Sequence, residues 1–343
     1  MNRPTLRDVA ERAGVSVSAV SYALNENSTF PLAEKTRARI RRIAREIGYV
    51  PNSLARSLKN RTARLVGVIL DKPLANPRYA AIVEGLSRGA AEEGFQVVLL
   101  TSRDHGSGVD AVRGGQLDGL VFIGHDDHVV PAALAAAVAE HAIPFGAIDC
   151  GRADAVPPYT TVDLDYAAGV DLVVERLAAD GVRAVTYVRP DLLSHAERVR
   201  EQAMLDALTA RPEMSLSVLQ TGVTAERLGS FERTGDYAAY RAELGARLAA
   251  ALERGSTPPA QTAFVCSWGS DVETVLATVR RRDPGYRVAG LNRGALEPAQ
   301  WPGLIHAEMP LGEAGRVCAA AVVRTARDNT PAVHQMLPPA LVG

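Results

Sequence analysis

The sequence predicts an α/β protein in which a small helical head precedes a two-lobed body of doubly wound parallel sheets. The chain has 343 residues, enough for two or three domains of ~100–200 residues. Basic residues gather at the N-terminus over short helical patterns, and from residue 65 apolar strands alternate with amphipathic helices. Such alternation is typical of parallel sheets covered by helices on both faces.

Composition excludes several other classes of protein. With 47% hydrophobic and 22% charged residues, the chain is not disordered as a whole. Its longest apolar runs, 132–139 and 317–323, are far shorter than the ~20 residues that span a bilayer, and no signal-peptide core is present. Cys150, Cys266 and Cys318 form neither a disulfide framework nor a CxxC pair. We therefore expect a cytoplasmic protein without membrane contact, metal or other cofactor.

Charge is distributed unevenly, although the formal net charge is −1. Residues 1–64 hold 13 Lys and Arg against 5 Asp and Glu, whereas the rest of the chain holds 25 against 34. A basic head on an acidic body indicates a polyanionic partner for the head alone. The alternative is a solvated basic face, and the helix pattern decides between the two.

Two short helices joined by a tight turn begin the head. Thr5 can cap the first helix with Asp8 three residues on, Gly14 permits the turn, and Ser16 can cap the second helix. The outer face of the second helix carries small or planar groups that fit the ~12 Å wide major groove of DNA. These are Val17, Ser18, Ser21 and Tyr22. The pattern is that of a helix-turn-helix.

A third helix follows Pro31 and ends at Gly48, before Pro51. Its inward positions are Thr36, Ile40, Ile43, Ala44 and Ile47. Its arginines are expected in solvent; they are Arg37, Arg39, Arg41, Arg42 and Arg45.

Residues 51–61 predict a helix of only about two turns, which Asn52 can cap. Isolated helices shorter than ~12–15 residues are marginal in water, so this one should form only when something packs against it. Leu58 beside Lys59 suits insertion into the minor groove of DNA, where apolar wedges open a base step. The alternative is a plain linker helix that packs on its own domain.

The body shows apolar runs that we predict to be buried parallel strands. They are 65–70, 95–101, 119–124, 144–149, 184–189, 216–221, 263–267 and 288–292. Helices are predicted at 79–94, 131–142, 166–179, 194–210, 236–253 and 271–282. The body is longer than one sheet usually fills, so we expect two lobes with a closable cleft at the carboxyl ends of the strands.

The head and hinge combine several motifs: TLRDVAERAGVS, the VS–LN recognition helix, KTR, GYVPN and LARSL. With them, residues 5–67 resemble the headpiece and hinge of the LacI/GalR family of transcriptional regulators. The resemblance implies that Thr5 and Ser16 contact phosphates and that Val17, Ser18 and Tyr22 face bases. It also implies that Leu58 wedges the centre of a palindromic operator beside Ala55 and Lys59. The remaining candidates for DNA contact are Leu6, Ser21, Asn25 and Asn52.

Tyr22 departs from the family pattern, because many members place Arg at this position. Arg is the usual bidentate partner of guanine. We therefore expect fewer guanine contacts from this helix and more recognition through apolar contact and DNA shape.

The body resembles the family's effector domain, which is related in fold to periplasmic sugar-binding proteins. The matching segments are 75–86, 161–169, 194–208, 290–294 and 310–323. The resemblance implies three crossings between lobes, near 160, 292 and 325. The expected domains are 1–50 for the headpiece, 51–63 for the hinge helix and linker, and 64–343 for the effector-binding and dimerisation domain. Within the last, we expect 64–160 and 293–325 in the first lobe and 161–292 and 326–343 in the second.

The resemblance also places a ligand in the cleft between the lobes. The candidate contacts are Asp71, Arg78, Tyr79, His125, Asp149, Arg200, Trp268, Asp271, Asn292 and Arg293. Tyr79 and Trp268 are suited to stack on a sugar face, and Asp149, Arg200 and Asn292 to hold hydroxyls. A neutral sugar or glycoside is the first expectation, and an anionic ligand is the alternative if Arg78, Arg200 and Arg293 converge. Arg200 has a structural ion pair as its alternative role, and His125 lacks the spacing of a metal site.

We expect a homodimeric DNA-binding regulator, a repressor rather than an activator, that binds a palindromic double-stranded operator. The helix at 79–94 should lie near the dimer interface, and cleft closure should favour or forbid the hinge helix. The alternatives are a regulator with an anionic or protein co-effector, a solute-binding protein, and a sequence-blind DNA binder. An enzyme is not expected, because no GxSxG, GxGxxG or Walker A motif is present.

Overall fold

The computed structural model describes residues 4–24, 30–50, 62–100, 105–124, 129–151, 156–192, 194–292 and 301–343. The chain divides into two compact units, Met1–Ala63 and Arg64–Gly343. We call them the head and the body and describe each by itself. Among the described residues, no helix combines the length and the apolar character needed to cross a membrane.

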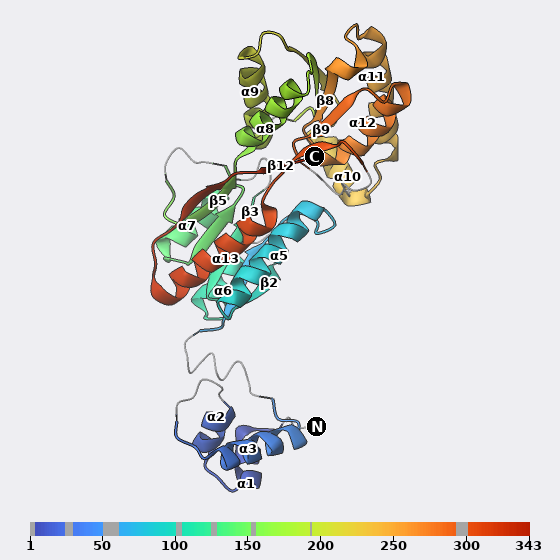
Figure 1. The fold of residues 1–343 in the computed structure, drawn as a ribbon. Helices are drawn as coiled ribbons and strands as arrows, with labels where there is room; N and C mark the ends of the chain where they lie inside the picture. The colour runs from blue at the N-terminus through green and yellow to red at the C-terminus, as the bar shows by residue number, and fades with distance from the viewer. Residues whose placement is uncertain are drawn as a thin grey trace. The chain divides into compact units, whose positions relative to one another are not determined.

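The described part of the head contains three helices around one small core (Figure 1). They are α1 (Leu6–Ala13), α2 (Val17–Leu24) and α3 (Glu34–Glu46). The predicted capping box at the start of α1 is confirmed, since Thr5 and Asp8 each bond the other's backbone N–H. Gly14 and Gly48 both adopt left-handed backbone angles, φ +62° and +68°, at the ends of α1 and α3. Local capping signals therefore fix the helix boundaries of the head.

The first sheet of the body contains six strands in the order β11-β5-β4-β3-β1-β2, all parallel. The strands are β1 (Leu65–Ile69), β2 (Gln96–Leu100), β3 (Gly119–Ile123), β4 (Phe145–Ile148), β5 (Thr160–Leu164) and β11 (His334–Leu337). The helices that follow or precede them are α5 (Pro77–Glu92), α6 (His105–Arg113), α7 (Ala132–Glu140) and α13 (Leu311–Asp328). This sheet and its helices form the first lobe.

The second sheet also contains six strands, in the order β12-β10-β9-β8-β6-β7, of which only β12 is antiparallel to its neighbour. The strands are β6 (Ala184–Arg189), β7 (Ser215–Gln220), β8 (Thr262–Cys266), β9 (Arg287–Gly290), β10 (Ile305–Glu308) and β12 (Ala340–Val342). The helices are α8 (Tyr166–Ala179), α9 (His195–Thr209), α10 (Ala225–Thr234), α11 (Ala238–Arg254), α12 (Gly269–Arg282) and a 3₁₀ turn, η1 (Pro259–Gln261). These elements form the second lobe.

The predicted eight strands and six helices of the body are all present, but the lobe boundaries differ from those expected. The first crossing follows β5, which ends at Leu164, close to the expected position near 160. The second lies between β10 and α13 rather than near 292, and the third lies between β11 and β12 rather than near 325. The stretch 301–308 therefore belongs to the second lobe and 326–337 to the first. The sequence pattern misses the second and third crossings because β10 (IHAE) and β11 (HQML) mix polar with apolar residues and β12 (ALV) has only three residues, so none of them forms a continuous apolar run.

Helices α5 and α13 of the first lobe lie against each other with their backbones in close approach (Figure 1). A Cβ atom on Gly85 would overlap the carbonyl oxygen of Gly312, and one on Gly315 would overlap that of Ile82. Glycine is therefore required at this crossing for steric reasons. The crossing fixes the start of α5, which faces the second lobe.

Candidate functional site

The outward face of α2 is small and accessible. Ser16 caps the helix, since its Oγ accepts a hydrogen bond from the backbone N–H of Ala19 at 3.1 Å. Val17 is 44% exposed, and Ser18 is exposed as well. The structure therefore brings the N-terminal end of α2 to the surface of the head, as the sequence predicts.

Tyr22 is held from two sides and is half-buried. Its ring stacks on Phe30 with 4.4 Å between centroids and 9° between planes. Nη1 of Arg37 donates to the carbonyl of Tyr22 at 3.3 Å, and Nε of Arg41 donates to the carbonyl of Ala23 at 3.2 Å. The expectation that Arg37 and Arg41 lie in solvent is thus wrong, because they satisfy carbonyls in the last turn of α2.

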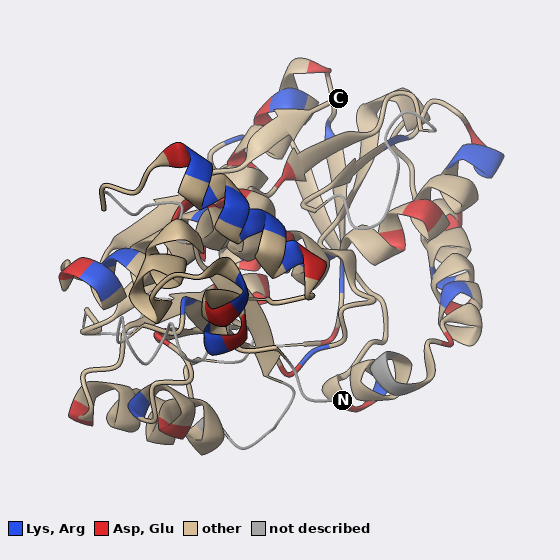
Figure 2. Ribbon diagram, turned by 90° about the horizontal axis from the view of Figure 1, so that it is seen from below, with Lys and Arg blue, Asp and Glu red and all other residues tan. Residues whose placement is uncertain are grey.

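The other candidates for DNA contact are distributed as follows. Thr5 is exposed, Ser21 is half-buried, and Leu6 packs partly against the core of the head. Asn25, Asn52, Ala55, Leu58 and Lys59 lie outside the described residues. Figure 2 shows Lys and Arg concentrated along α3, and a basic surface of this kind attracts phosphates without reading sequence.

A cleft of about 840 Å³ lies between the lobes of the body. The first lobe contributes Asn76 and Arg78 at the start of α5 and Leu311 at the start of α13. The second lobe contributes four candidate groups near the carboxyl ends of β8 and β9 and on α9: Arg200, Ser267, Trp268 and Asn292. This is the edge at which doubly wound sheets bind ligands.

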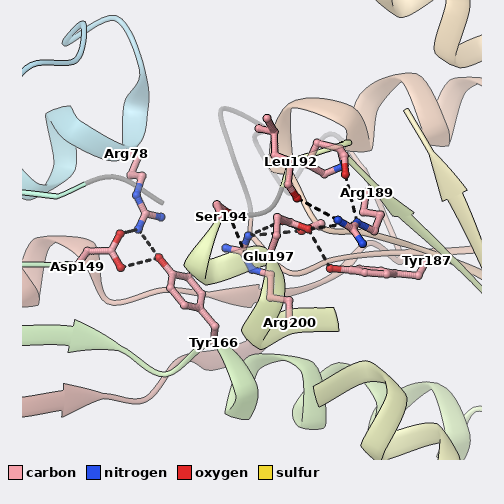
Figure 3. Close-up of polar contacts among 11 residues, drawn as sticks. Arg78, Asp149, Tyr166, Tyr187, Arg189, Leu192, Ser194, Glu197 and Arg200 are labelled. Atoms are coloured by element: carbon pink, nitrogen blue, oxygen red, sulfur yellow. Dashed lines mark hydrogen bonds and ion pairs between the residues drawn. The ribbon is translucent and has the colours of Figure 1, made fainter. Parts of the chain in front are cut away.

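Arg200 lines the cleft and pairs with a buried carboxylate (Figure 3). The side chains of Arg200 and Glu197 are only 3% and 1% exposed. Nη1 of Arg200 donates to Oε1 of Glu197 at 3.1 Å and to Oγ of Ser267 at 3.4 Å, while Oγ of Ser267 donates to the same Glu197 oxygen. The positive charge of Arg200 is therefore balanced within the protein, as buried charges require.

Glu197 also connects to a second arginine behind the cleft wall (Figure 3). Arg189 Nε lies 4.0 Å from Oε2 of Glu197, and its Nη1 donates to Oε1 of Glu201 at 2.5 Å. The hydroxyl of Tyr187 donates to Oε2 of Glu197 at 3.4 Å. Burial raises the pKa of Tyr187, so the phenol stays a hydrogen-bond donor. These contacts fix α9 on β6.

A second polar cluster joins the lobes at the cleft (Figure 3). Nη2 of Arg78 donates to Oδ2 of Asp149 and, at 2.6 Å, to the hydroxyl of Tyr166. The Tyr166 hydroxyl donates in turn to Oδ1 of Asp149 at 2.8 Å. Asp149 has φ +56°, a left-handed conformation that costs about 1 kcal/mol or more in a residue other than glycine.

Two predicted ligand contacts lie in the protein interior instead. Tyr79 is fully buried in the core of the first lobe, because it shares a face of α5 with Ile82 and Leu86 at helical spacing. Asp271 is fully buried in the first turn of α12 and accepts a hydrogen bond from the hydroxyl of Tyr240 at 2.8 Å. Burial raises the pKa of Asp271 to about 7.

The remaining candidates divide between the cleft and other places. Trp268 and Asn292 line the cleft, as does Arg78. Asp149 lies in the polar cluster just described and is not among the cleft-lining residues, and Asp71 is exposed outside the cleft. His125 and Arg293 lie outside the described residues. Among the described residues, no group of His, Cys, Asp and Glu is arranged to hold a metal ion.

Sequence reasoning missed an aromatic wall of the cleft on α10 and the start of α11. Phe231 lies 5.0 Å from Tyr237 and 5.6 Å from Tyr240, measured between ring centroids. These three rings and Leu228 line the cleft. The signal was present as aromatic residues at helical spacing in DYAAY (236–240), but α10 itself was not predicted.

The three cysteines show no sign of a reactive thiol. Cys266 and Cys318 are fully buried, and Cys150 is half-buried. Burial raises the pKa of each thiol well above its usual range, which suppresses the nucleophilic thiolate.

Two family models match most of the chain. Residues 5–52 match "Bacterial regulatory proteins, lacI family", and residues 63–245 match "Periplasmic binding proteins and sugar binding domain of LacI family". The PtxS regulator of Pseudomonas aeruginosa is 30% identical over an alignment of 356 positions, gaps included, that covers 99% of this chain and 94% of PtxS. The CelR regulator of Thermobifida fusca is 33% identical over 223 residues, which cover 61% of this chain and 62% of CelR.

Solved structures share the fold over the whole length. The Lac repressor dimer bound to operator and the anti-inducer ONPF has a TM-score of 0.75 at 21% identity, covering 100% of this chain and 98% of that one. The CelR–cellobiose complex has a TM-score of 0.61 at 24% identity, covering 99% of both chains. A helix-turn-helix head, a two-lobed body and these matches together place the chain in the LacI family of bacterial transcriptional regulators.

Proposed function

We propose that this LacI-family regulator is a repressor that binds a palindromic operator as a homodimer, and that a neutral sugar or glycoside in the interlobe cleft changes its affinity for DNA. The observation that carries the proposal is the chemistry of the cleft. Two of its described arginines, Arg78 and Arg200, already have carboxylate partners, and aromatic rings supply one wall. Polar groups beside aromatic faces suit an uncharged polyol.

The charges of the cleft favour a neutral ligand over an anionic one. Arg78 pairs with Asp149 and Arg200 with Glu197. Three further carboxylates line the same cleft, namely Glu273, Glu308 and Glu313, against one further arginine, Arg241. An anion would have to displace a buried carboxylate or face this negative charge, and both are unfavourable.

The relatives support a sugar ligand and a repressing role. CelR was solved with cellobiose. A sucrose operon repressor of Pediococcus pentosaceus and a ribose operon repressor of Escherichia coli are each 30% identical to this chain over 128 residues. Trp268 and Tyr237 are the rings we expect to stack on the sugar, with Arg200, Ser267 and Asn292 as its hydrogen-bond partners.

Exposed apolar residues on two sheet edges support a homodimer. Strands β2 and β7 are the last strands of the two sheets. Val98 and Leu99 on β2 are each 37% exposed, and Val218 on β7 is 48% exposed. Apolar sheet edges are normally covered, and two heads in one dimer read a palindrome more specifically than one. A second copy of this chain is the occupant we propose.

The sugar is tested by titration calorimetry with cellobiose, glucose, ribose and glucose 6-phosphate. A neutral sugar should bind, and Trp268→Ala should weaken it by about tenfold or more, because a stacked ring is lost. Trp301→Ala is the matched control, since Trp301 packs on the core of the second lobe and does not line the cleft. Binding of the phosphorylated sugar alone would contradict the neutral ligand.

The operator is tested by selecting bound sequences from random DNA and measuring affinity against salt concentration. A palindrome should emerge, and affinity should fall steeply with salt because phosphates are contacted. Equal competition by random DNA would indicate a sequence-blind binder instead. Sedimentation of the free protein tests the dimer, and Val218→Glu should produce monomers if β7 lies in the interface.

A further inference from the structure

We infer that Tyr166 is a positioning residue that connects the ligand-gripping Arg200 to the first lobe, with Asp149 as its anchor there rather than as a ligand contact. The inference rests on the proposed function for the role of Arg200. It goes beyond that function by naming the residue that ties the cleft to the relative position of the lobes.

The hydroxyl of Tyr166 joins the two lobes directly. Tyr166 is the first residue of α8, immediately after the chain leaves the first sheet, and it is 4% exposed. Its hydroxyl donates to Asp149 at the end of β4 and accepts from Arg78 on α5, both in the first lobe. A phenol has one proton to donate, and Tyr166 donates it to Asp149 in the other lobe.

The guanidinium of Arg200 packs against the face of the Tyr166 ring. The guanidinium carbon of Arg200 lies 4.4 Å from the ring centroid, well within the range of a cation–π contact. Glu197 and Ser267 hold the same guanidinium at the cleft wall. A ligand hydroxyl that draws Arg200 into the cleft must therefore change its contact with the ring. The hydroxyl of the same residue, Tyr166, is hydrogen-bonded to the first lobe (Figure 3).

Asp149 is the residue of the first lobe that accepts the hydrogen bond from Tyr166. Its Oδ1 accepts from Tyr166 and its Oδ2 from Arg78, so each carboxylate oxygen is engaged by the protein. Its backbone N–H donates to the carbonyl of Val162 on β5 at 2.9 Å. The left-handed φ of +56° is unfavourable for aspartate and persists only where the surroundings hold it. Strain of this kind is common at switch positions.

The two contacts of the Tyr166 side chain, that of its ring with Arg200 and that of its hydroxyl with the first lobe, can be tested separately by substitution. Tyr166→Phe keeps the ring under Arg200 and removes only the hydroxyl that bonds the first lobe. Asp149→Asn keeps an acceptor for the hydroxyl but removes the charge that Arg78 pairs with. A matched control is Tyr286→Phe, which removes a phenol hydroxyl from a half-buried ring that packs on Phe264 in the second lobe, away from this cluster.

The test measures the separation of the lobes in the full-length chain without any sugar. Dyes are attached to cysteines introduced at Glu140 on α7 and Glu253 on α11, one exposed site in each lobe. Native thiols react slowly because burial raises their pKa. Labelled protein is diluted into unlabelled protein, so that single-molecule energy transfer reports one chain at a time. Thermal melts confirm that each variant is folded.

In Tyr166→Phe, the ratio of widely separated to closely spaced lobes should rise about tenfold, because charge-assisted hydrogen bonds are lost. Asp149→Asn should shift the ratio in the same direction, and Tyr286→Phe should leave it unchanged. Unchanged distances in both Tyr166→Phe and Asp149→Asn would overturn the inference, as would an equal shift in Tyr286→Phe. Because no sugar is present, a failed sugar screen would count against the proposed function alone.

Discussion

Asp271→Asn provides a sharp test of the interior of the second lobe. Asp271 is fully buried, and its Oδ1 accepts hydrogen bonds from Tyr240 at 2.8 Å and Ser270 at 3.3 Å. Its Oδ2 is buried without a hydrogen-bond partner among the described residues. Burial is the main cause that raises its pKa to about 7 from an ordinary 3.8, with the nearby charge of Glu197 acting in the same direction.

The pKa of Asp271 makes the stability of the protein depend on pH. Between about pH 4 and pH 7 the folded chain keeps a proton that the unfolded chain releases, so stability falls as pH rises through this window. At 1.36 kcal/mol for each unit of pKa, the loss amounts to about 4 kcal/mol above pH 7. Asparagine has nearly the same shape and cannot ionise, so Asp271→Asn should remove this part of the pH dependence.

The assay is urea unfolding between pH 4.5 and about pH 8, followed by tryptophan fluorescence. The chain has two tryptophans, Trp268 and Trp301, and both belong to the second lobe with Asp271. We expect the free energy of unfolding of the wild-type protein to fall as pH rises, approaching and then crossing below that of Asp271→Asn, whose curve is flatter. The unpaired amide of asparagine costs about 1–3 kcal/mol at every pH, which shifts its curve without changing the slope. Parallel curves would refute the reasoning.

Three further predictions concern glycine packing, helix capping and operator binding. Gly89→Ala should destabilise the first lobe by about 2 kcal/mol, because the added Cβ would overlap the carbonyl of Arg316. Gly245→Ala should stabilise the second lobe by about 0.5–1 kcal/mol, because its Cβ would meet only Thr278 at 3.7 Å. Urea unfolding measures both changes. Thr5→Ala should lower the stability of the head by about 1 kcal/mol in circular-dichroism melts, since a capping box is lost. Leu58→Ala should weaken operator binding in fluorescence anisotropy and leave sugar affinity unchanged; full operator affinity would contradict a minor-groove wedge.

Local sequence information was sufficient for most elements of the fold. The capping box of Thr5 and Asp8, the left-handed turns at Gly14 and Gly48, and the apolar strands of the body depend on neighbours within a few residues, and all appear in the structure. The motifs of the head identified the family for the same reason, because they lie in one continuous segment.

Burial and pairing across long distances were decided only by the tertiary structure. Tyr79 looked like a cleft residue from its motif, yet the face of α5 that it shares with Ile82 packs inward. Asp149 looked like a ligand contact, yet Arg78 and Tyr166 occupy it from distant parts of the chain.

The sequence by itself determined that the chain folds as a helix-turn-helix head and a two-lobed α/β body, because repeating apolar spacings and caps encode these elements locally. Only the tertiary structure decided where the chain crosses between lobes and which cleft arginines are already neutralised. These features depend on strands of three or four residues and on ion pairs such as Arg78–Asp149, whose partners lie 71 positions apart. No local sequence pattern predicts which distant carboxylate will pair with a buried arginine.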